Sequence, residues 1–207
     1  MKKQYIIAGV GTEIGKTFIS SILTESLEAD YWKPIQSGSL EFTDSDTVKS
    51  LISNTKTHFH KEAYRLNEPL SPHAAAAIDG IEIQLDKFEI PQTDNHLFVE
   101  LAGGIMVPLN EECTNLDLIK KLNLPVILVS KNYLGSINHT LLSIEVLKSR
   151  NIEIAGLIFN GVHTPTTENF ILNYTKVKLL GQVNQEREIT KETVRKYAES
   201  FRNALCD

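Results

Sequence analysis

The chain has 207 residues, of which 42% are hydrophobic and 23% are charged. This composition is typical of a globular protein, and the length suits one core, so we expect a single domain over residues 1–207. The formal net charge is -5, and the sequence holds no basic cluster. We therefore expect no nucleic-acid partner, because nucleic-acid binding needs a positive patch.

The first residues, MKKQYIIAGVG, do not read as a signal peptide, because the apolar run is short and polar residues follow it at once. No apolar run approaches the length of a membrane span, so we expect no membrane partner and a cytoplasmic protein. The two cysteines, Cys113 and Cys206, lie far apart without metal-ligand spacing. We expect them to be reduced bystander thiols.

Short apolar runs alternate with amphipathic stretches along the chain. The expected strands are QYIIAGV, YWKPI, HLFVELA, PVILVS, EIAGLIFNG and VKLLGQV, at residues 4–10, 31–35, 96–102, 125–130, 153–161 and 177–183. The expected helices cover 15–29, 45–52, 136–149 and 191–204, and another follows the turn LNEPLSP. The run PVILVS is apolar on both faces, as parallel sheets require. This alternation predicts an α/β fold with a mostly parallel sheet and helices on both faces.

The stretch AGVGTEIGKTF, residues 8–18, joins the first strand to the first helix. A glycine-bearing turn before a helix aims backbone N–H groups and the positive helix end at one point, which suits a polyphosphate. Lys16 would reach the β- and γ-phosphates, and the Thr17 hydroxyl would bind Mg²⁺. Five residues rather than four separate Gly9 from Gly15, which widens the loop. The alternative is a structural Gly-Lys-Thr at a helix start.

Acidic residues near this loop are candidates for the metal site, because Mg²⁺ takes one or two carboxylates together with phosphate oxygens. Glu100 ends an apolar strand, where open α/β sheets place their ligands. The stretch TDSDTV offers Asp44 and Asp46 at the start of a helix. For Asp44, helix capping is the favoured interpretation and a metal ligand is the alternative, whereas Asp46 suits both the first turn and the metal.

Lys33 ends the second strand, and Pro34 stops that strand. A second lysine at the carboxyl edge of the sheet would neutralise charge that develops during phosphoryl transfer. Ser37 follows in a stretch that we expect to be a turn. Taken singly, Lys33 and Ser37 would each be interpreted as an ordinary surface residue. Their position directly after the second strand is what makes them candidates for the site.

Other polar residues have a structural alternative. Ser71 is expected to cap the helix that follows it, and His73 in the first turn is a ligand contact or a packed histidine. The pair Gly135-Ser136 begins a helix after a buried strand, which makes a second anion-receptive helix start. We assign no metal to His58, His60 or His139.

Seven stretches in this order resemble the dethiobiotin synthetase family. They are GTEIGKT, KPIQSG, DSDT, PLSPHAA, VELAGG, PVILVSKNYLGSINHTLL and GLIFNG, and the match runs from about residue 4 to residue 186. The phosphate loop of that family also has five residues between its glycines. The resemblance implies a P-loop NTPase-like α/β fold and a homodimer, with the substrate site completed by the partner subunit.

The resemblance also implies an ATP-dependent carboxylating cyclo-ligase of biotin biosynthesis. Its substrates would be ATP, 7,8-diaminononanoate and CO₂, with Mg²⁺ as the metal. One amine takes up CO₂ as a carbamate, and a carbamate oxygen attacks the γ-phosphate of ATP to give a carbamic–phosphoric anhydride. The second amine then closes the ureido ring, which releases ADP and phosphate.

The family's functional positions carry over residue by residue. The essential lysines fall on Lys16 and Lys33, and the metal ligands fall on Thr17, Asp46 and Glu100. The implied ATP contacts are Glu13, Ile14, Gly15, Lys16, Thr17, Phe18, Asp46, Glu100, Leu101, Ala102, Gly103, Asn160, Gly161, Asn184, Gln185 and Glu186. The implied substrate contacts are Thr12, Ser37, Leu134, Gly135, Ser136, Ile137 and Asn138.

Four positions depart from the family pattern. Gly11 stands where the family usually has Asp, and Leu101 stands where a glycine is usual. Gly161 replaces a frequent Asp, and Asn184 replaces a common proline. These departures concern the binding of the nucleotide base more than the phosphate chemistry.

Two other classes of function remain alternatives. One is a different P-loop enzyme, either amidotransferase-like or a partner-regulated ATPase. The chain is too short for an added glutaminase domain, and it lacks the second lysine early in the loop that partner-regulated ATPases carry. The other is a nucleotide-binding regulatory module without turnover, which has no need of a second transfer lysine such as Lys33.

Overall fold

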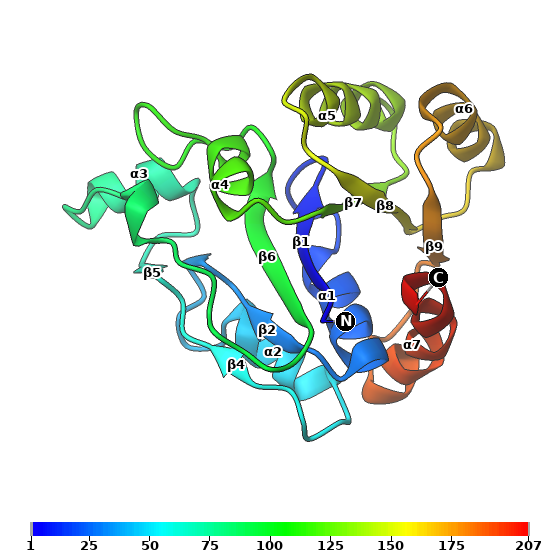
Figure 1. The fold of residues 1–207 in the computed structure, drawn as a ribbon, viewed down its shortest axis with the longest axis horizontal. Helices are drawn as coiled ribbons and strands as arrows, with labels where there is room; N and C mark the ends of the chain where they lie inside the picture. The colour runs from blue at the N-terminus through cyan, green and yellow to red at the C-terminus, as the bar shows by residue number, and fades with distance from the viewer. Residues whose placement is uncertain (1, 207) are drawn as a thin grey trace.

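The computed structural model describes residues 2–206, and the side chain of Cys206 lies outside the described part. A seven-stranded sheet runs through the molecule in the order β4-β2-β6-β1-β7-β8-β9, and its strand pairs are parallel (Figure 1). Its strands are β1 (Gln4–Gly9), β2 (Asp30–Trp32), β4 (Phe59–His60), β6 (Leu97–Gly104), β7 (Val126–Lys131), β8 (Ile154–Asn160) and β9 (Leu179–Val183). A separate sheet pairs β3 (Ile35–Ser37) with β5 (Tyr64–Leu66).

Helices cover both faces of the large sheet. They are α1 (Lys16–Leu27), α2 (Asp44–Leu51), α3 (Pro72–Ile78), α4 (Asn115–Leu122), α5 (Ser136–Ser149), α6 (Pro165–Thr175) and α7 (Lys191–Cys206), with a 3-10 turn at Leu85–Lys87. Helices α1, α2 and α7 pack together, and α5 packs beside α6 on the other side (Figure 1). This architecture confirms the predicted α/β fold with a parallel sheet between two helical layers.

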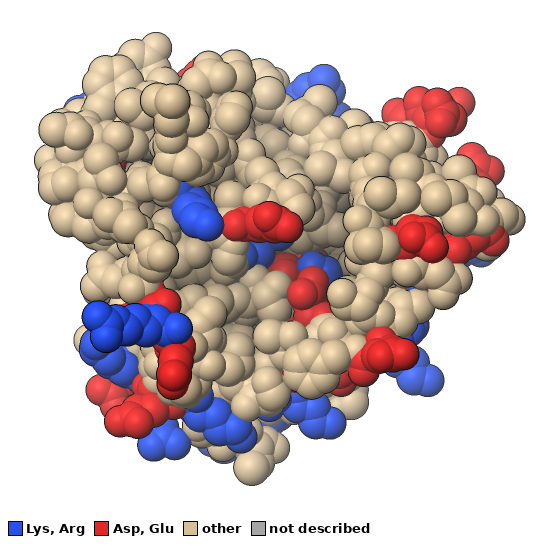
Figure 2. Space-filling view, turned by 180° about the vertical axis from the view of Figure 1, so that it is seen from behind, with Lys and Arg blue, Asp and Glu red and all other residues tan. Residues whose placement is uncertain are grey.

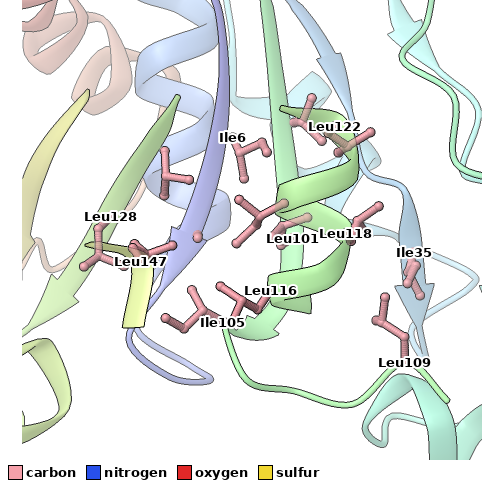
Figure 3. Close-up of a cluster of buried hydrophobic side chains, with 14 of the residues drawn as sticks. Ile6, Ile35, Leu101, Ile105, Leu109, Leu116, Leu118, Leu122, Leu128 and Leu147 are labelled. Carbon is pink, nitrogen blue, oxygen red and sulfur yellow. The ribbon is translucent and has the colours of Figure 1, made fainter. Parts of the chain in front are cut away.

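The alternation of side chains along β1 explains the two layers, because successive residues of a strand point to opposite faces. Ile6 and Ala8 belong to the core cluster that holds α4 and α5, whereas Ile7 belongs to the cluster that holds α1 and α7. Figure 3 shows part of the first cluster, where leucines of α4 meet Ile6 and Leu101 of the sheet. Leu101 is therefore a core residue, with 2% of its surface exposed.

The strand expected at residues 31–35 is present as β2, but its predicted end is wrong. β2 ends at Trp32, and Ile35 begins β3 in the second sheet. Pro34 lacks a backbone N–H and cannot continue a central ladder, while its carbonyl oxygen accepts the N–H groups of Ala63 and Tyr64. The chain therefore changes sheets at Pro34, and Ser37 lies in a strand rather than in the expected turn.

Several elements have no counterpart in the sequence-based expectation. β4, β5, α4 and α6 are the main ones, and the first three are short, with two, three and eight residues. An eight-residue helix covers about two turns, which is too few for a clear helical period. A signal for α4 is nevertheless present, because Thr114 and Asp117 form a reciprocal capping box.

The surface agrees with the composition. Acidic and basic side chains lie interspersed on the face shown in Figure 2, without a broad basic area on that face. Within residues 2–206, none of the helices has the length and apolar character needed to cross a bilayer. Cys113 is a free, partly exposed thiol.

A buried carboxylate joins the edge of the large sheet to the turn before β6. Asp30, at the start of β2, accepts hydrogen bonds from the backbone N–H of His58 at 3.0 Å, from Thr93 Oγ1 at 2.5 Å and from Asn95 Nδ2 at 3.1 Å. Burial alone would raise the pKa of Asp30, but these donors outweigh it and hold the pKa below its ordinary value. The ionised carboxylate therefore stabilises the fold.

Replacing this carboxylate tests its contribution. Asp30→Asn should lower the free energy of unfolding at pH 7 by roughly 1 to 3 kcal/mol, because the charge-assisted hydrogen bonds are lost. Since the folded pKa is lowered, the wild-type advantage is complete above the ordinary pKa and disappears as the pH falls through the folded value. Urea unfolding at neutral and acidic pH measures both effects.

The exposed Asp94, which pairs with Lys2 at the surface, gives a matched control. Asp94→Asn should leave the unfolding free energy nearly unchanged at both pH values. A loss for Asp30→Asn that stays the same at acidic pH would contradict the assigned role of the ionised carboxylate.

Candidate active site

The loop between β1 and α1 depends on the glycines at its two ends. Gly15 has φ 87°, and a Cβ there would lie 2.2 Å from Asn160 Nδ2. That amide donates to the carbonyl oxygen of Ile14 at 2.7 Å, so β8 buttresses the loop. A Cβ on Gly9 would lie 2.9 Å from the carbonyl oxygen of Gly11. At both ends of the five-residue spacing, a neighbouring group lies so close to the backbone that a Cβ would clash with it. Glycine is therefore required at both positions.

Gly11, inside the loop, is different. A Cβ at this position would meet no atom within 4 Å. The first atom of a side chain would therefore meet no obstacle at this position. Packing does not explain why this chain has glycine at Gly11.

Lys16 is the first residue of α1 and is 8% exposed. Its Nζ lies 3.3 Å from the carbonyl oxygen of Gly11, to which it donates. Burial, and then the neighbouring charge of Lys33, lowers its pKa to about 8, although Glu100 and Asp44 act in the opposite direction. A cation with so little compensation is well placed to receive an anionic ligand.

Lys33, which follows β2, is 4% exposed and joins two carboxylates. Its Nζ lies 2.6 Å from Asp44 Oδ2 and 3.0 Å from Glu100 Oε1. Burial alone would lower the pKa of Lys33, but Glu100 and Asp44 outweigh it and raise the pKa. Asp44 shows the converse effect, because burial would raise its pKa whereas Lys33 and then Thr17 lower it. Lys33 and Asp44 are thus held in their charged forms.

The Thr17 hydroxyl completes this cluster. It lies 3.1 Å from Asp44 Oδ1 and 3.0 Å from Glu100 Oε1. A hydroxyl has one proton and donates to only one of these oxygens at a time. Thr17 Oγ1, Asp44 Oδ1 and Glu100 Oε1 therefore converge, and Lys33 Nζ also donates to Glu100 Oε1 at 3.0 Å. Such a set of oxygen atoms suits a small divalent cation.

Tyr31 is a site residue that the sequence analysis missed. Its ring is fully buried in β2, and its hydroxyl donates to Glu100 Oε2 at 2.9 Å. Burial, followed by the charge of Glu100, raises its pKa well above the ordinary value, so the phenol keeps its proton. The signal was its position two residues before Lys33, because residues two apart on a strand share a face.

A cavity of about 730 Å³ at the carboxyl edge of β1, β2 and β6 is lined by Lys16, Thr17, Lys33, Asp44 and Glu100, whereas Tyr31 is not among its lining residues. Ten of the residues predicted for the site line it: Thr12, Glu13, Gly15, Lys16, Thr17, Lys33, Ser37, Glu100, Ala102 and Gly103. The turn at residues 69–72 closes another side. Ser37 Oγ is buried here and has no hydrogen-bond partner within the described part of the chain, so it is free to accept a ligand contact.

Three predicted ATP contacts pack into the core instead. Ile14 and Leu101 are each 2% exposed, and Phe18 packs edge-on against Tyr197. Their side chains support the loop, and only their backbone atoms remain to meet a ligand.

The two aspartates of α2 have exchanged the roles that the sequence analysis favoured. Asp44 lines the cavity and contacts Thr17 and Lys33, so it is not the helix cap. Thr43 is the cap, and Asp46 forms a capping box with it, because Asp46 Oδ2 accepts the Thr43 N–H at 2.9 Å and its Oγ1–H at 2.7 Å. Asp46 is exposed to solvent and does not line the cavity.

The segments predicted for the base lie near one another, because the Gly161 N–H donates to the carbonyl oxygen of Val183 at 2.8 Å. Asn160 supports the loop, and Gly161 has φ 98°. Tyr197 Oη accepts the N–H of Asn184 at 3.1 Å and donates to Glu186 Oε1 at 2.5 Å. Residues 184–186 are therefore fixed to α7 by Tyr197 through these contacts.

The predicted substrate segment 134–138 lies apart from this cavity. It lines a second hollow of about 850 Å³ at the start of α5. A groove of about 380 Å³ is bordered by Thr12 and Val107, which also line the first cavity, and by Met106, His139 and Leu142. The side chain of Leu134 is fully exposed. The structure thus does not bring 134–138 to the phosphate loop within one chain.

The histidines have polar neighbours of their own. Ser71 occupies the cap position of α3 but makes no capping hydrogen bond with its side chain, which contacts His73 Nδ1 at 3.0 Å instead. His139 Nδ1 lies 2.7 Å from the Tyr133 hydroxyl. His58 and His60 pack ring against ring. Among residues 2–206, no group of three or more His, Cys, Asp or Glu side chains could hold a metal by itself.

A metal at this site would thus depend on the oxygen set already described. Thr17 and two carboxylates fit Mg²⁺, which usually keeps one or two carboxylate ligands and takes phosphate oxygens and water for the rest. The same edge holds the loop and the start of α1, which fit a polyphosphate.

Lys16 offers a test of the charge at this edge. Lys16→Met should raise the free energy of unfolding of the ligand-free protein at pH 7 by roughly 1 to 3 kcal/mol, because a buried cation with a lowered pKa opposes folding. The unfolded chain holds more protons than the fold between pH 8 and 10.5, so wild-type stability rises over that range and the gain of the variant shrinks. Thermal unfolding from pH 7 to pH 10.5 measures this trend.

Exposed Lys120 on α4 serves as the control. Lys120→Met should change the unfolding free energy little and without this pH trend. A Lys16→Met variant that is less stable than wild type at pH 7 would show that the buried ammonium is well compensated.

Comparison with known proteins places the chain in a family. The model of the AAA domain family matches residues 3–193. The ATP-dependent dethiobiotin synthetase of Christiangramia forsetii is 54% identical over all 207 residues, and it is covered completely. The enzymes of the same name from Cytophaga hutchinsonii and Chlamydia felis are 49% and 43% identical, with at least 95% of each chain covered.

Solved structures of P-loop ATPases share the fold at low identity. The septum site-determining protein MinD of Pyrococcus horikoshii, complexed with Mg-ADP, aligns over 99% of this chain and 94% of its own, with a TM-score of 0.61 and 14% identity. A ParA family ATPase from Chlorobium tepidum aligns with a TM-score of 0.59 and 12% identity, over 100% of this chain and 95% of its own. At such identities the likeness concerns the fold alone, whereas the dethiobiotin synthetases are 43–54% identical over at least 95% of this chain. With a phosphate loop, a buried second lysine and these relatives, the chain belongs to the ATP-dependent dethiobiotin synthetase family.

Proposed function

We propose that this protein is an ATP-dependent dethiobiotin synthetase, which forms the ureido ring of dethiobiotin from 7,8-diaminononanoate, CO₂ and ATP. The observation that carries the proposal is the position of Lys33, buried between Glu100 and Asp44 in the cavity that also holds Lys16. A nucleotide-binding site needs one lysine for phosphate. A second buried lysine beside it would offset the charge of another anion that approaches that phosphate.

The reaction brings two anions together. The carbamate of the diamine attacks the γ-phosphorus of ATP, the bond to ADP breaks, and a carbamic–phosphoric anhydride forms. The second amine then attacks the carbamoyl carbon, and phosphate leaves as the ring closes. Lys16 and Lys33 offset the negative charge, and the N–H groups at the start of α1 receive the phosphate oxygens.

Mg²⁺ would be held by Thr17, Glu100 and one aspartate of α2. When bound, it supplies further charge neutralisation on the phosphate oxygens. Tyr31 keeps Glu100 oriented from the side opposite Thr17, because it contacts the other carboxylate oxygen.

The diamine substrate would extend from the cavity at the phosphate loop into the groove beside α5. Thr12 and Ser37 are next to the reacting groups, and Thr12 also borders the groove beside α5. Since 134–138 lies in a separate hollow, we propose a homodimer in which the helix start of one subunit receives the carboxylate of substrate bound to its partner. The exposed apolar side chains of Met106, Leu134 and Leu142 are consistent with such an interface.

The base of ATP would lie against Asn160, Gly161 and residues 184–186. These segments come from the loops after β8 and β9, on the same edge of the sheet as the phosphate loop. Asn160 joins the two regions, because its amide also buttresses the carbonyl of Ile14.

A partner-regulated ATPase is the second candidate, because the solved structures that share this fold include MinD and ParA proteins. Coupling between substrates separates the two functions. ATP hydrolysis should require both the diamine and bicarbonate, because phosphate is released only after a carbamate has accepted it. Phosphate release measured with each substrate omitted in turn tests this. Vigorous hydrolysis with ATP alone would favour the partner-regulated ATPase.

Lys33→Ala should abolish ring formation, with a loss of about 10²-fold or more in turnover, while ATP binding stays largely intact because Lys16 and the loop remain. The change also leaves Glu100 without its lysine and lowers stability. ATP binding by calorimetry and dethiobiotin formation should therefore be compared at a temperature where circular dichroism shows the variant folded. Lys33→Met, which keeps the apolar stem, should behave alike. Unchanged product formation in either variant would rule out this role.

A further inference from the structure

A buried carboxylate that the candidate active site does not use lies among the segments that end β7, β8 and β9. It belongs to Glu168 in the first turn of α6, which is 4% exposed. We propose that Glu168 and Asn132 form a positioning pair, which holds the segment 134–138 in place and thereby sets the affinity for the carboxylate end of the diamine. The inference rests on the proposed function, in which the start of α5 receives that carboxylate.

The contacts of Glu168 reach several parts of the chain. Its Oε1 accepts the backbone N–H of Thr164 at 2.9 Å, Asn132 Nδ2 at 2.5 Å and Gln182 Nε2 at 3.2 Å. Its Oε2 lies 2.6 Å from His163 Nδ1. Thr164 is the cap position of α6, whereas Asn132 follows β7 and Gln182 lies in β9. The carboxylate therefore joins segments that are far apart in the sequence.

A helix cap is the simpler role for Glu168, because an acidic side chain in the first turn of a helix satisfies the free N–H groups there. That role needs one oxygen atom and one backbone donor. Three side chains contact the same carboxylate in addition. Hydrogen bonds to a carboxylate are roughly twice as strong as those between neutral groups. Capping alone therefore does not explain these contacts.

Asn132 provides the link to the start of α5. Its side-chain amide donates to Glu168 and, at 2.9 Å, to the carbonyl oxygen of Val162. Its Oδ1 is buried and has no hydrogen-bond partner within residues 2–206. A buried oxygen without a partner destabilises a fold. The orientation of the Asn132 amide is therefore set by its two acceptors, although its own oxygen is left unpaired.

The segment 134–138 and its approach have few anchors of their own. The side chain of Leu134 is fully exposed, Tyr133 is 42% exposed, and Gly135 has φ 100°. The Ser136 N–H donates locally, to the carbonyl oxygen of Tyr133 at 3.0 Å. Exposed segments with few buried contacts open at low free energy. A link to the neighbouring loop therefore matters for the order of this segment.

The hollow at the start of α5 lies between the two loops that the pair joins. Residues 132–138 form one wall, and Val162, Thr164 and Thr167 belong to the other. The helices that follow these loops, α5 and α6, lie side by side (Figure 1). Glu168 is not among the described residues that line the hollow, because its oxygens face the donors already named. The pair thus fixes the separation of the walls from behind.

Order in this segment before the ligand arrives favours binding. A loop that becomes ordered only on binding loses part of the binding free energy as conformational entropy. The N–H groups at a helix start receive an anion well only when they point at one position. The pair should therefore act on the affinity for the diamine rather than on the phosphoryl transfer, which would take place beside Lys16 and Lys33.

Asn132→Ala tests the link, because it removes the amide and leaves Glu168 with its other donors. In the ligand-free protein, the amides of residues 133–138 should exchange about tenfold faster. The Michaelis constant for the diamine should rise about five- to tenfold, while kcat stays within about twofold. Hydrogen exchange followed by mass spectrometry and initial rates of dethiobiotin formation measure these effects.

Two variants of Glu168 separate the lost oxygens from the changed shape. Glu168→Met keeps the length and removes both oxygens, so it should match Asn132→Ala in both measurements. Glu168→Gln keeps one acceptor oxygen, and its amide can donate to His163 Nδ1 in the other tautomer. It should therefore keep the Michaelis constant within about twofold of wild type. Circular dichroism establishes that each variant is folded at the assay temperature.

Gln182→Ala is the matched control, because it removes a hydrogen bond to the same Glu168 oxygen from the side of β9. It should leave exchange at 133–138 and the Michaelis constant for the diamine unchanged. Unchanged exchange in Asn132→Ala would overturn the inference. So would faster exchange with an unchanged Michaelis constant, or a Glu168→Met variant that loses thermal stability alone. If the wild-type protein forms no ureido ring, the proposed function fails, and the exchange rates still decide whether the pair fixes this segment.

Discussion

The ammonium group of Lys33 holds the site together. It lies between Glu100 of β6 and Asp44 of α2, so one contact set joins the large sheet to a helix anchored on the small sheet. Removing any one of these three charges would leave a buried or half-buried partner uncompensated, which costs more free energy than the pair itself contributes. The three residues can therefore be replaced only together without a loss of stability, whatever their part in the reaction.

Much of the site could be predicted from sequence because it lies at strand ends. The phosphate loop, Lys33 and Glu100 each follow a buried apolar run, and the carboxyl ends of neighbouring parallel strands meet at one edge. Pro34 marked the end of β2 correctly, yet local reasoning extended the strand to Ile35. Whether the chain after a proline rejoins a sheet depends on a distant partner, here Tyr64 of β5, which local periodicity does not reveal.

The aspartates of α2 show a different limit. The letters TDSD allow either residue to cap or to face the site, and the choice depends on where the helix begins. That point is set by Thr43 and by the contact between Gln36 and Asp44, which is tertiary. The segment 134–138 shows a third limit. Within one chain it lies apart from the phosphate loop, so it could reach such a loop only in a second chain, and the sequence of one chain does not reveal that contact.

The change of sheets at Pro34 gives the cavity two walls of different strength. Glu100 stands on the seven-stranded parallel sheet and Thr17 in the first turn of α1, whereas Ser37 stands on a two-stranded sheet. Two strands alone are only marginally stable, so that wall depends on its surroundings for order. We therefore expect the free energy of local unfolding to be lower for the two-stranded sheet, on the side that would hold the diamine. A ligand that contacts both walls would stabilise this sheet. Order in the small sheet would thus depend in part on the ligand that fills the cavity between the two walls.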